Sequence, residues 1–99
     1  MINIGVFCSS LDGKIIFSEL AKDLGKKITQ NNLSLVYGGG KLGLMGDIAK
    51  EVKSKGSIVI SVIPDYLNKP SITYNDADKI HVTSDLFERK RKLIGLSDI

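Results

Sequence analysis

The sequence predicts a three-layer α/β fold, with a parallel sheet lying between helices on both faces. Short apolar runs alternate along the chain with stretches in which apolar residues recur every three or four positions. This alternation is typical of parallel strands joined by amphipathic helices. The run at 58–63 is almost continuously apolar, as expected for a strand covered on both faces. Right-handed strand–helix–strand units of this kind build a Rossmann-like sheet.

Each element is predicted from its local pattern. Strands are expected at 2–7, 33–37, 58–63 and 80–82. The first expected helix has an apolar stripe formed by Phe17, Leu20, Ala21, Leu24 and Ile28. A second helix follows from the apolar stripe within 44–52, and a last helix is expected from about 86 to 96, capped by Ser84 or Asp85. Pro64 should end the third strand, and 65–79 should form a loop.

The pattern contains no repeat or linker, so residues 1–99 are interpreted as one domain. Residues 97–99 look like the start of a fifth strand, and a doubly wound sheet usually continues past the crevice where its strand order reverses. The chain is therefore expected to be a truncated or split form, incomplete at its C-terminus. The apolar face of the last helix (Leu86, Leu93 and Ile94) is expected to lack packing partners, and the fourth strand should have an open edge.

Composition narrows the class of protein. No stretch approaches the roughly 20 apolar residues that span a bilayer, and the first ten residues lack the basic region of a signal peptide. The lone Cys8 fits a reducing compartment. We therefore expect a cytoplasmic protein without membrane contact. The net charge of +3 suits an anionic small ligand without requiring one.

The most informative motif is the glycine-rich segment 37–46, which follows an expected strand and opens an expected helix. Glycines there allow positive φ and bring backbone N–H groups close to an anion, while the helix adds its positive end. Gly38, Gly40 and Gly43 match G-x-G-x-x-G. The motif lies in the second turn rather than the first, and Asp65 is a poor ribose ligand, so an ordinary NAD site is not favoured. Alternatively, these glycines serve only tight turning and close helix packing.

Several segments together resemble the LOG ("lonely guy") family, also called lysine decarboxylase-like. The matching segments are Phe-Cys-Ser-Ser at 7–10, the glycine segment 36–46, Val-Ile-Pro at 62–64, and Glu-Arg-Lys at 88–90 followed by Ser-Asp at 97–98. The resemblance implies a Rossmann-type fold, usually dimeric. It also implies hydrolysis of a nucleoside 5′-monophosphate, either a cytokinin riboside monophosphate or AMP, to free base and ribose 5-phosphate. No cofactor or metal is expected, since nothing suggests a pyridoxal phosphate site.

The resemblance also assigns residues to roles. Arg89 corresponds to the family's catalytic arginine. The substrate-binding residues it implies are Ser9, Ser10, Gly38, Gly39, Gly40, Gly43, Met45, Arg89 and Lys90. Two features depart from the family pattern: Cys8 is followed directly by the serine pair, and the Pro-Gly-Gly-x-Gly-Thr-x-x-Glu motif with the catalytic glutamate would lie past Ile99. The 99-residue chain is therefore expected to bind its ligand weakly and to be inactive alone.

Other interpretations remain open at this stage. The basic run 89–92 could contact nucleic acid, although a solvated helix face is the commoner meaning of such a run. Cys8 is expected to be a small buried residue and His81 a structural one. Ser9 and Ser10 either touch the ligand or merely cap the first helix. A non-catalytic module that binds a nucleotide or a cofactor is the alternative to the hydrolase.

Overall fold

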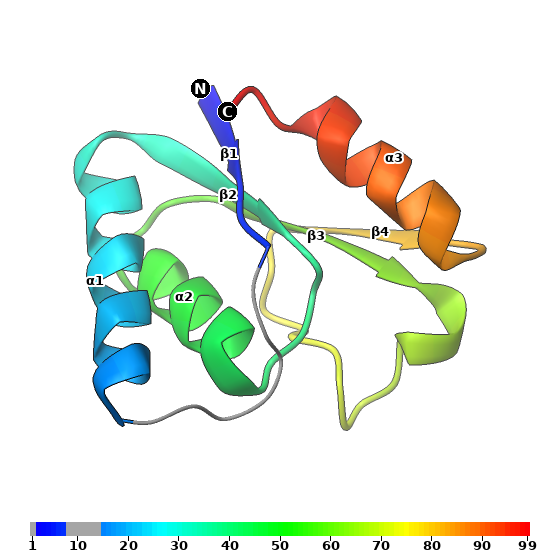
Figure 1. Ribbon diagram of the computed structural model, residues 1–99, viewed down its shortest axis with the longest axis horizontal. Helices are drawn as coiled ribbons and strands as arrows, with labels where there is room; N and C mark the ends of the chain where they lie inside the picture. The colour runs from blue at the N-terminus through cyan, green and yellow to red at the C-terminus, as the bar shows by residue number, and fades with distance from the viewer. Residues whose placement is uncertain (1, 8–14) are drawn as a thin grey trace.

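The structure, a computed structural model, describes residues 2–7 and 15–99. Its four strands are parallel and lie in the order β1-β2-β3-β4 (Figure 1). The strands are β1 (Ile2–Gly5), β2 (Leu33–Tyr37), β3 (Val59–Pro64) and β4 (Lys79–Thr83). The helices are α1 (Ile15–Gln30), α2 (Gly43–Ser54) and α3 (Leu86–Leu96), with a 3-10 turn at Asp65–Leu67. The expected α/β architecture is confirmed. The four expected strands and three expected helices are all present, and each strand begins and ends within two residues of its expected bounds.

Helices cover both faces of the sheet. In Figure 1, α1 and α2 lie together on one side of the strands and α3 lies on the other. Alternation along β2 explains how one strand serves both layers. Leu35 and Tyr37 point into the larger core beneath α1 and α2, whereas Val36 points into the smaller core beneath α3. This two-sided burial accounts for the apolar composition of β2 and β3.

Helix α3 carries the chain from one edge of the sheet to the other. It leaves β4, crosses above β3 and β2, and ends beside β1. There the amide of Asp98 donates to the carbonyl of Asn3 at 2.8 Å, and the amide of Gly5 donates to the carbonyl of Ile99 at 3.0 Å. Residues 98–99 thus bond to the free edge of β1, although they are not assigned as the strand that the sequence led us to expect there. The chain therefore returns to the edge of β1 opposite β2, and in doubly wound sheets ligands bind where the strand order reverses in this way.

The predicted apolar stripe of α1 is partly wrong. Ala21 and Ile28 are buried, but Leu20 is 57% exposed and Leu24 is 37% exposed. The buried face is rotated because Gly25 lies against α2, where an added Cβ would lie 2.9 Å from Cβ of Glu51. The close approach of α1 to α2 at Gly25 therefore determines which face of α1 is buried. Phe17 belongs to the same predicted stripe, and its side chain lies outside the described part of the structure.

Two further expectations need correction. Leu93 was expected to lack packing partners, yet it is 4% exposed and packs on Val36, Ile60 and Val62, a burial that stabilises by about 2 kcal/mol. Leu86 and Ile94 remain exposed as predicted. The segment 65–79 is not simply a loop, since it contains a 3-10 turn and a β-bridge. Pro64 is the last residue of β3 and so ends the strand, as expected.

The start of α3 follows the predicted capping chemistry. The side chain of Asp85 accepts a hydrogen bond from the amide of Glu88 at 2.7 Å, so Asp85 rather than Ser84 is the N-cap of α3. The Glu88 carboxylate in turn accepts a hydrogen bond from the amide of Ser84 at 3.2 Å. No helix in the described part of the chain is both long and apolar enough to cross a membrane.

Candidate functional site

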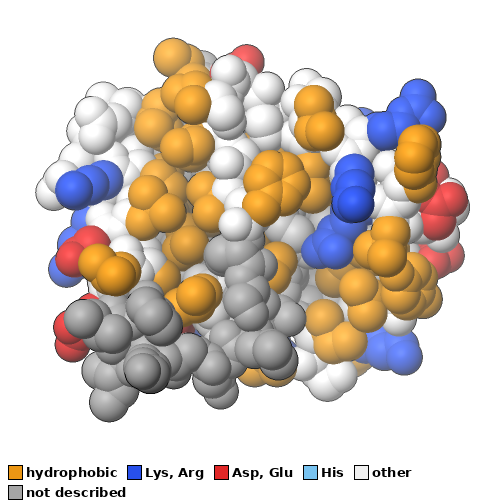
Figure 2. Space-filling view, viewed as in Figure 1, with side chains coloured by type: hydrophobic (Ala, Val, Ile, Leu, Met, Phe, Trp, Pro, Cys, Tyr) orange, Lys and Arg blue, Asp and Glu red, His pale blue; other side chains and the backbone are white. Residues whose placement is uncertain are grey.

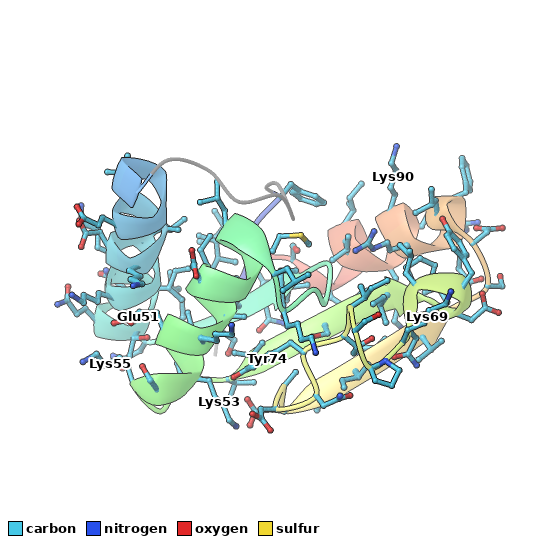
Figure 3. The ribbon with its side chains drawn as sticks, turned by 90° about the horizontal axis from the view of Figure 1, so that it is seen from below. Glu51, Lys53, Lys55, Lys69, Tyr74 and Lys90 are labelled. Atoms are coloured by element: carbon cyan, nitrogen blue, oxygen red, sulfur yellow. The ribbon has the colours of Figure 1, made fainter. Side chains whose placement is uncertain are left out.

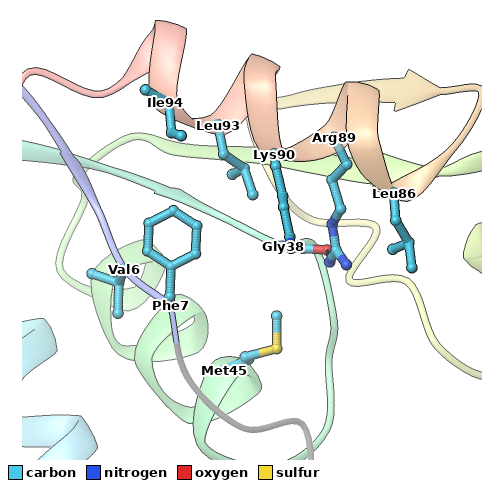
Figure 4. Close-up of a pocket in the computed structure, with 9 residues that line it drawn as sticks. All are labelled: Val6, Phe7, Gly38, Met45, Leu86, Arg89, Lys90, Leu93 and Ile94. Carbon is cyan, nitrogen blue, oxygen red and sulfur yellow. Dashed lines mark hydrogen bonds between the residues drawn. The ribbon is translucent and has the colours of Figure 1, made fainter.

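A cavity of about 300 Å³ opens beneath α3 at the carboxyl ends of β1 and β2. Figure 4 shows Arg89 and Lys90 reaching from α3 toward Gly38, with Met45 of α2 on the opposite wall. The lining residues are Val6, Phe7, Gly38, Met45, Leu86, Arg89, Lys90, Leu93 and Ile94. The cavity thus combines mostly apolar walls with two cationic side chains. Its place at the carboxyl ends of the strands is where parallel sheets bind ligands.

Arg89 connects α3 to two neighbouring strand ends. Its Nε donates a hydrogen bond to the carbonyl of Val62 at 3.0 Å, and its Nη2 donates to the carbonyl of Gly38. Arg89 reaches these atoms because Leu93, one helical turn later, holds the same face of α3 against the sheet. The guanidinium is therefore fixed beside the cavity by two backbone contacts.

Among the described residues, none neutralises the charge of Arg89. Burial is the main influence on its pKa and lowers it below the ordinary value, while the charge of Tyr66 acts in the opposite direction. A guanidinium nevertheless stays protonated in proteins. No salt bridge to Arg89 is present within residues 2–7 and 15–99. A half-buried cation that keeps N–H groups beyond its two backbone bonds is suited to an anionic ligand.

The glycine turn (residues 38–40) is held by its carbonyl groups. All three of its carbonyl oxygens accept hydrogen bonds from other parts of the fold. The donors, in order along the turn, are Nη2 of Arg89, the amide of Tyr74 (2.9 Å) and the hydroxyl of Tyr37 (2.9 Å). The amides of Gly39 and Gly40 donate to no residue in the described part of the chain. The turn therefore presents donors and keeps its acceptors engaged, as an anion-binding turn must.

Each glycine of the turn has a different requirement. Gly39 has a φ of 87°, a conformation that side chains rarely adopt. A Cβ on Gly38 would overlap Arg89 and Met45. Among the described residues, a Cβ on Gly40 would meet only Sδ of Met45, at 3.9 Å. Packing against those residues therefore does not explain the lack of a side chain at Gly40.

The N-terminus of α2 adjoins this turn. Gly43 begins the helix with a φ of 64°. The N-cap residue Leu42 supplies no side-chain cap, and the first turn holds no acidic residue. The first backbone amides of a helix lack partners within the helix and carry its positive end. This terminus accordingly adds to the positive potential beside the cavity.

The structure brings together most of the residues that the sequence singled out. Gly38, Met45, Arg89 and Lys90 line the cavity, whereas Gly39, Gly40 and Gly43 lie in the adjoining backbone. Ser9 and Ser10 lie outside the described residues. These positions are compatible with the predicted roles, and the roles themselves stay predictions.

Sequence reasoning missed the apolar walls. Val6 and Phe7 follow β1, and Leu86, Leu93 and Ile94 lie on α3. A signal for the α3 residues was present, because Leu86 and Leu93 lie seven positions apart with Arg89 between them and so share one helix face. Phe7, at 66% exposed, looked like part of a buried strand and gave no such signal.

The acidic residue closest in sequence to Arg89 is engaged elsewhere. Glu88 contacts Ser84 and Asp85 at the start of α3, as expected from its orientation about 100° around the helix. None of the described residues that line the cavity is acidic. Within the described residues, no cluster of His, Cys, Asp or Glu could hold a metal ion.

The fold and the cavity define a Rossmann-like α/β protein with a cation-bearing pocket at the strand ends. The chain belongs to the SLOG cluster4 family, whose match covers residues 1–98. This finding and the relatives below confirm the resemblance identified from the glycine segment and the Glu-Arg-Lys motif.

Curated relatives carry the name expected from that resemblance. The chain is 39% identical over 94 residues to the probable cytokinin riboside 5′-monophosphate phosphoribohydrolase LOGL2 of Oryza sativa subsp. japonica, covering 94% of this chain and 38% of the relative. It is 36% identical to LOG3 of Arabidopsis thaliana, which bears the same enzyme name, covering 96% of this chain and 45% of the relative. A Rhodococcoides fascians protein of that name is 33% identical, with 97% and 50% covered. The chain thus spans half or less of the length of these relatives.

Solved structures agree on the fold. TM1055 superposes with a TM-score of 0.75 at 21% identity, covering all of this chain (100%) and 58% of its own. The molybdenum cofactor carrier protein of Chlamydomonas reinhardtii superposes with a TM-score of 0.65 at 30% identity, covering 83% of this chain and 49% of its own. The first likeness concerns the fold alone, and the second protein is a carrier.

Proposed function

We propose that the cavity binds a nucleoside 5′-monophosphate, AMP or a cytokinin riboside monophosphate, and belongs to a phosphoribohydrolase. The observation that carries this proposal is the half-buried Arg89, which pairs with no acidic side chain in the described part of the chain, beside a glycine turn whose carbonyls are all engaged. Phosphate would accept hydrogen bonds from the amide of Gly40 and from the guanidinium. The enzyme name of the relatives supports the same ligand.

The apolar walls suit the base. Phe7 and Ile94 present exposed apolar surface at the cavity, and Leu93 forms part of its inner wall. A planar base lying against such side chains removes apolar area from water on both partners, which stabilises binding by roughly 25 cal/mol per Å². The proposed orientation therefore places phosphate at the glycine turn and the base between α3 and the end of β1.

Hydrolysis requires a catalytic carboxylate in addition to the residues that bind the nucleotide. Breaking an N-glycosidic bond passes through an oxocarbenium-like state, which a carboxylate stabilises while water attacks. Arg89 would fix the phosphate and the ribose, as its family role implies. None of the described cavity residues supplies the carboxylate. We therefore propose that residues 1–99 provide the nucleotide-binding part of the site and by themselves release no base from AMP.

The alternative is a carrier that binds a nucleotide or a phosphate-bearing cofactor without chemistry. The likeness to the molybdenum cofactor carrier and the absence of acidic side chains among the described cavity residues favour it. Both functions use the same anion site, so they differ in turnover and not in binding. We further propose that the protein acts in the cytoplasm as a homodimer, with nucleic acid not among its ligands.

Binding and turnover test the proposal separately. Calorimetric titration with AMP should give a heat of binding, whereas adenosine, which lacks the phosphate, should bind more weakly. Absence of AMP binding would contradict the proposed ligand. A coupled assay for free adenine should detect no release by the 99-residue chain and release by a form extended with the family's Pro-Gly-Gly-x-Gly-Thr-x-x-Glu segment. If that extended form binds AMP without releasing adenine, the carrier function is favoured.

A further inference from the structure

Tyr37 joins the core to the glycine turn. It is the last residue of β2, and its side chain is only 1% exposed within the larger core. Its hydroxyl donates a hydrogen bond to the carbonyl of Gly40 at 2.9 Å. A buried phenol needs a polar partner, and here that partner belongs to the turn beside the cavity. The ring is therefore part of the core, and the hydroxyl fixes the turn.

The peptide unit between Gly40 and Lys41 is held at both of its polar atoms. The carbonyl of Gly40 accepts from Tyr37, and the amide of Lys41 donates to the carbonyl of Ile72 at 2.9 Å. The preceding unit is held at one atom, because the carbonyl of Gly39 accepts from the amide of Tyr74 at 2.9 Å. A β-bridge between Gly40 and Thr73 joins the two segments.

These contacts set the direction of the Gly40 amide. A trans peptide unit directs its C=O and N–H groups to opposite sides, and the described residues contain no cis peptide bond. The Gly39 carbonyl points to Tyr74, so the Gly40 amide points away from the segment that contains Tyr74. Without the Tyr37 hydrogen bond, the carbonyl oxygen of Gly40 would have no partner among these contacts. The backbone of Gly40 could then rotate, and the direction of the Gly40 amide would change.

We infer that Tyr37 is a positioning residue for phosphate binding: its hydroxyl holds Gly40 so that the amides of the turn are oriented for the anion before the ligand arrives. This inference rests on the proposed function, since it assigns the phosphate to the same turn. A preorganised turn loses less conformational entropy when the ligand binds. The bond between Tyr37 and Gly40 therefore contributes to affinity without touching the ligand.

Tyr37→Phe tests the inference, because it removes the hydroxyl and keeps the ring. We expect affinity for AMP, measured by calorimetry, to fall about three- to tenfold, the range for one lost hydrogen bond. Affinity for adenosine should not change, because adenosine carries no phosphate. Equal affinity of Tyr37→Phe and the wild type for AMP would overturn the inference and leave the proposed function intact. Equal losses for AMP and adenosine would assign Tyr37 a purely structural role. If the wild type bound no AMP, the proposed function and the inference would both fail.

Tyr74→Phe is the matched control. Tyr74 is also buried, lies in the same core beneath α2 (Figure 3), and binds the turn through its backbone amide. Its hydroxyl makes no hydrogen bond in the described part of the structure, so this variant should bind AMP like the wild type. If the AMP affinity of Tyr74→Phe fell as much as that of Tyr37→Phe, the inference would be overturned.

A measurement on the wild type covers the case in which Tyr37→Phe does not fold. Hydrogen exchange followed by NMR should show the Lys41 amide protected without ligand, since its peptide unit is already fixed at both atoms. Exchange at the rate of an unstructured amide, slowed only when AMP is added, would show that the ligand orders the turn and would overturn the inference.

Discussion

Arg89 and Gly38 are 51 positions apart in sequence, and the guanidinium of the first donates a hydrogen bond to the carbonyl of the second. Gly38 has no side chain because a Cβ there would overlap that guanidinium. The contact joins α3 to the glycine turn and places a cation beside the turn's amides. It gives Arg89 a structural role as well as the proposed role in binding.

Arg89→Ala should therefore impair both stability and ligand binding. The carbonyls of Gly38 and Val62 would each lose a charged donor, which should lower the free energy of unfolding by about 1–3 kcal/mol. AMP affinity should fall at least tenfold, since a charge-assisted contact to phosphate is lost. Urea unfolding and calorimetry measure the two effects. The exposed Arg91 on the same helix gives the control, and a loss of affinity in Arg91→Ala equal to that in Arg89→Ala would contradict the assignment.

The ion pair between Asp78 and Lys53 predicts an acid-sensitive contribution to stability. Asp78 accepts from Nζ of Lys53 and from the amide of Val59, both at 2.8 Å. The Lys53 hydrogen bond is the largest cause that lowers the pKa of Asp78 below its ordinary value. A lowered folded-state pKa stabilises the protein above the unfolded-state pKa of about 3.9, and this stability is lost as the pH falls through the folded value.

Unfolding by urea between about pH 6 and pH 3 checks this expectation. Asp78→Asn should be less stable than the wild type at pH 6, and the difference should shrink as Asp78 becomes protonated. Asp76→Asn is the control, because Asp76 makes no hydrogen bond or salt bridge in the described part of the chain. A stability difference for Asp78→Asn that stays constant down to pH 3 would exclude this ion pair as the cause.

Exposed apolar side chains predict self-association. Figure 2 shows them spread across the face that includes β1 and α3. Among the described residues, the exposed apolar side chains of the molecule include Ile2, Phe7, Leu20, Ile94 and Ile99, each at least half exposed. Contiguous exposed apolar patches on a protein surface usually mark an interface. Sedimentation equilibrium should detect species heavier than the 10.8 kDa monomer, and Leu20→Lys should weaken the association. A stable monomer at high concentration would count against the proposed homodimer.

Ser61 is expected to lower stability. Its side chain is completely buried in β3 (0% exposed), and its hydroxyl has no hydrogen-bond partner in the described structure. Ser61→Ala should raise the free energy of unfolding by about 1 kcal/mol by removing an unsatisfied polar group. Ser57→Ala is the comparison, because the Ser57 hydroxyl donates to the carbonyl of Leu33 at 2.6 Å and its loss should destabilise. Destabilisation by Ser61→Ala would indicate a partner for this hydroxyl.

The fold could be predicted because it follows from periodic patterns of apolar residues. Contacts that leave no periodic pattern could not be predicted. Strands and helices were located because buried residues recur at regular spacings. The face of α1 was misassigned because Gly25 allows close approach to α2 and so turns Leu20 outward. A small residue at a helix contact leaves no apolar signal in the sequence.

The candidate site was predictable only in part for the same reason. The family resemblance singled out Arg89 and the glycine turn, and the fold brings them into contact. The hydrogen bond from the Tyr37 hydroxyl to the Gly40 carbonyl and the β-bridge between Gly40 and Thr73 could not be anticipated, because neither contact leaves a periodic signal in the sequence. Tyr37 looked like an ordinary strand residue, and only the position of its hydroxyl shows the contact with Gly40.

Gly40→Val tests the central claim, that the glycine turn holds the phosphate. The added side chain would extend from a position where the nearest described atom is Sδ of Met45, at 3.9 Å, so the fold should persist while the approach to the amides is blocked. Gly95→Val on α3 is the matched control, since a Cβ there meets nothing within 4 Å. Calorimetry should show AMP binding weakened at least tenfold in Gly40→Val and unchanged in Gly95→Val, with far-UV circular dichroism preserved in both. Equal AMP affinity in Gly40→Val and the wild type would contradict the account.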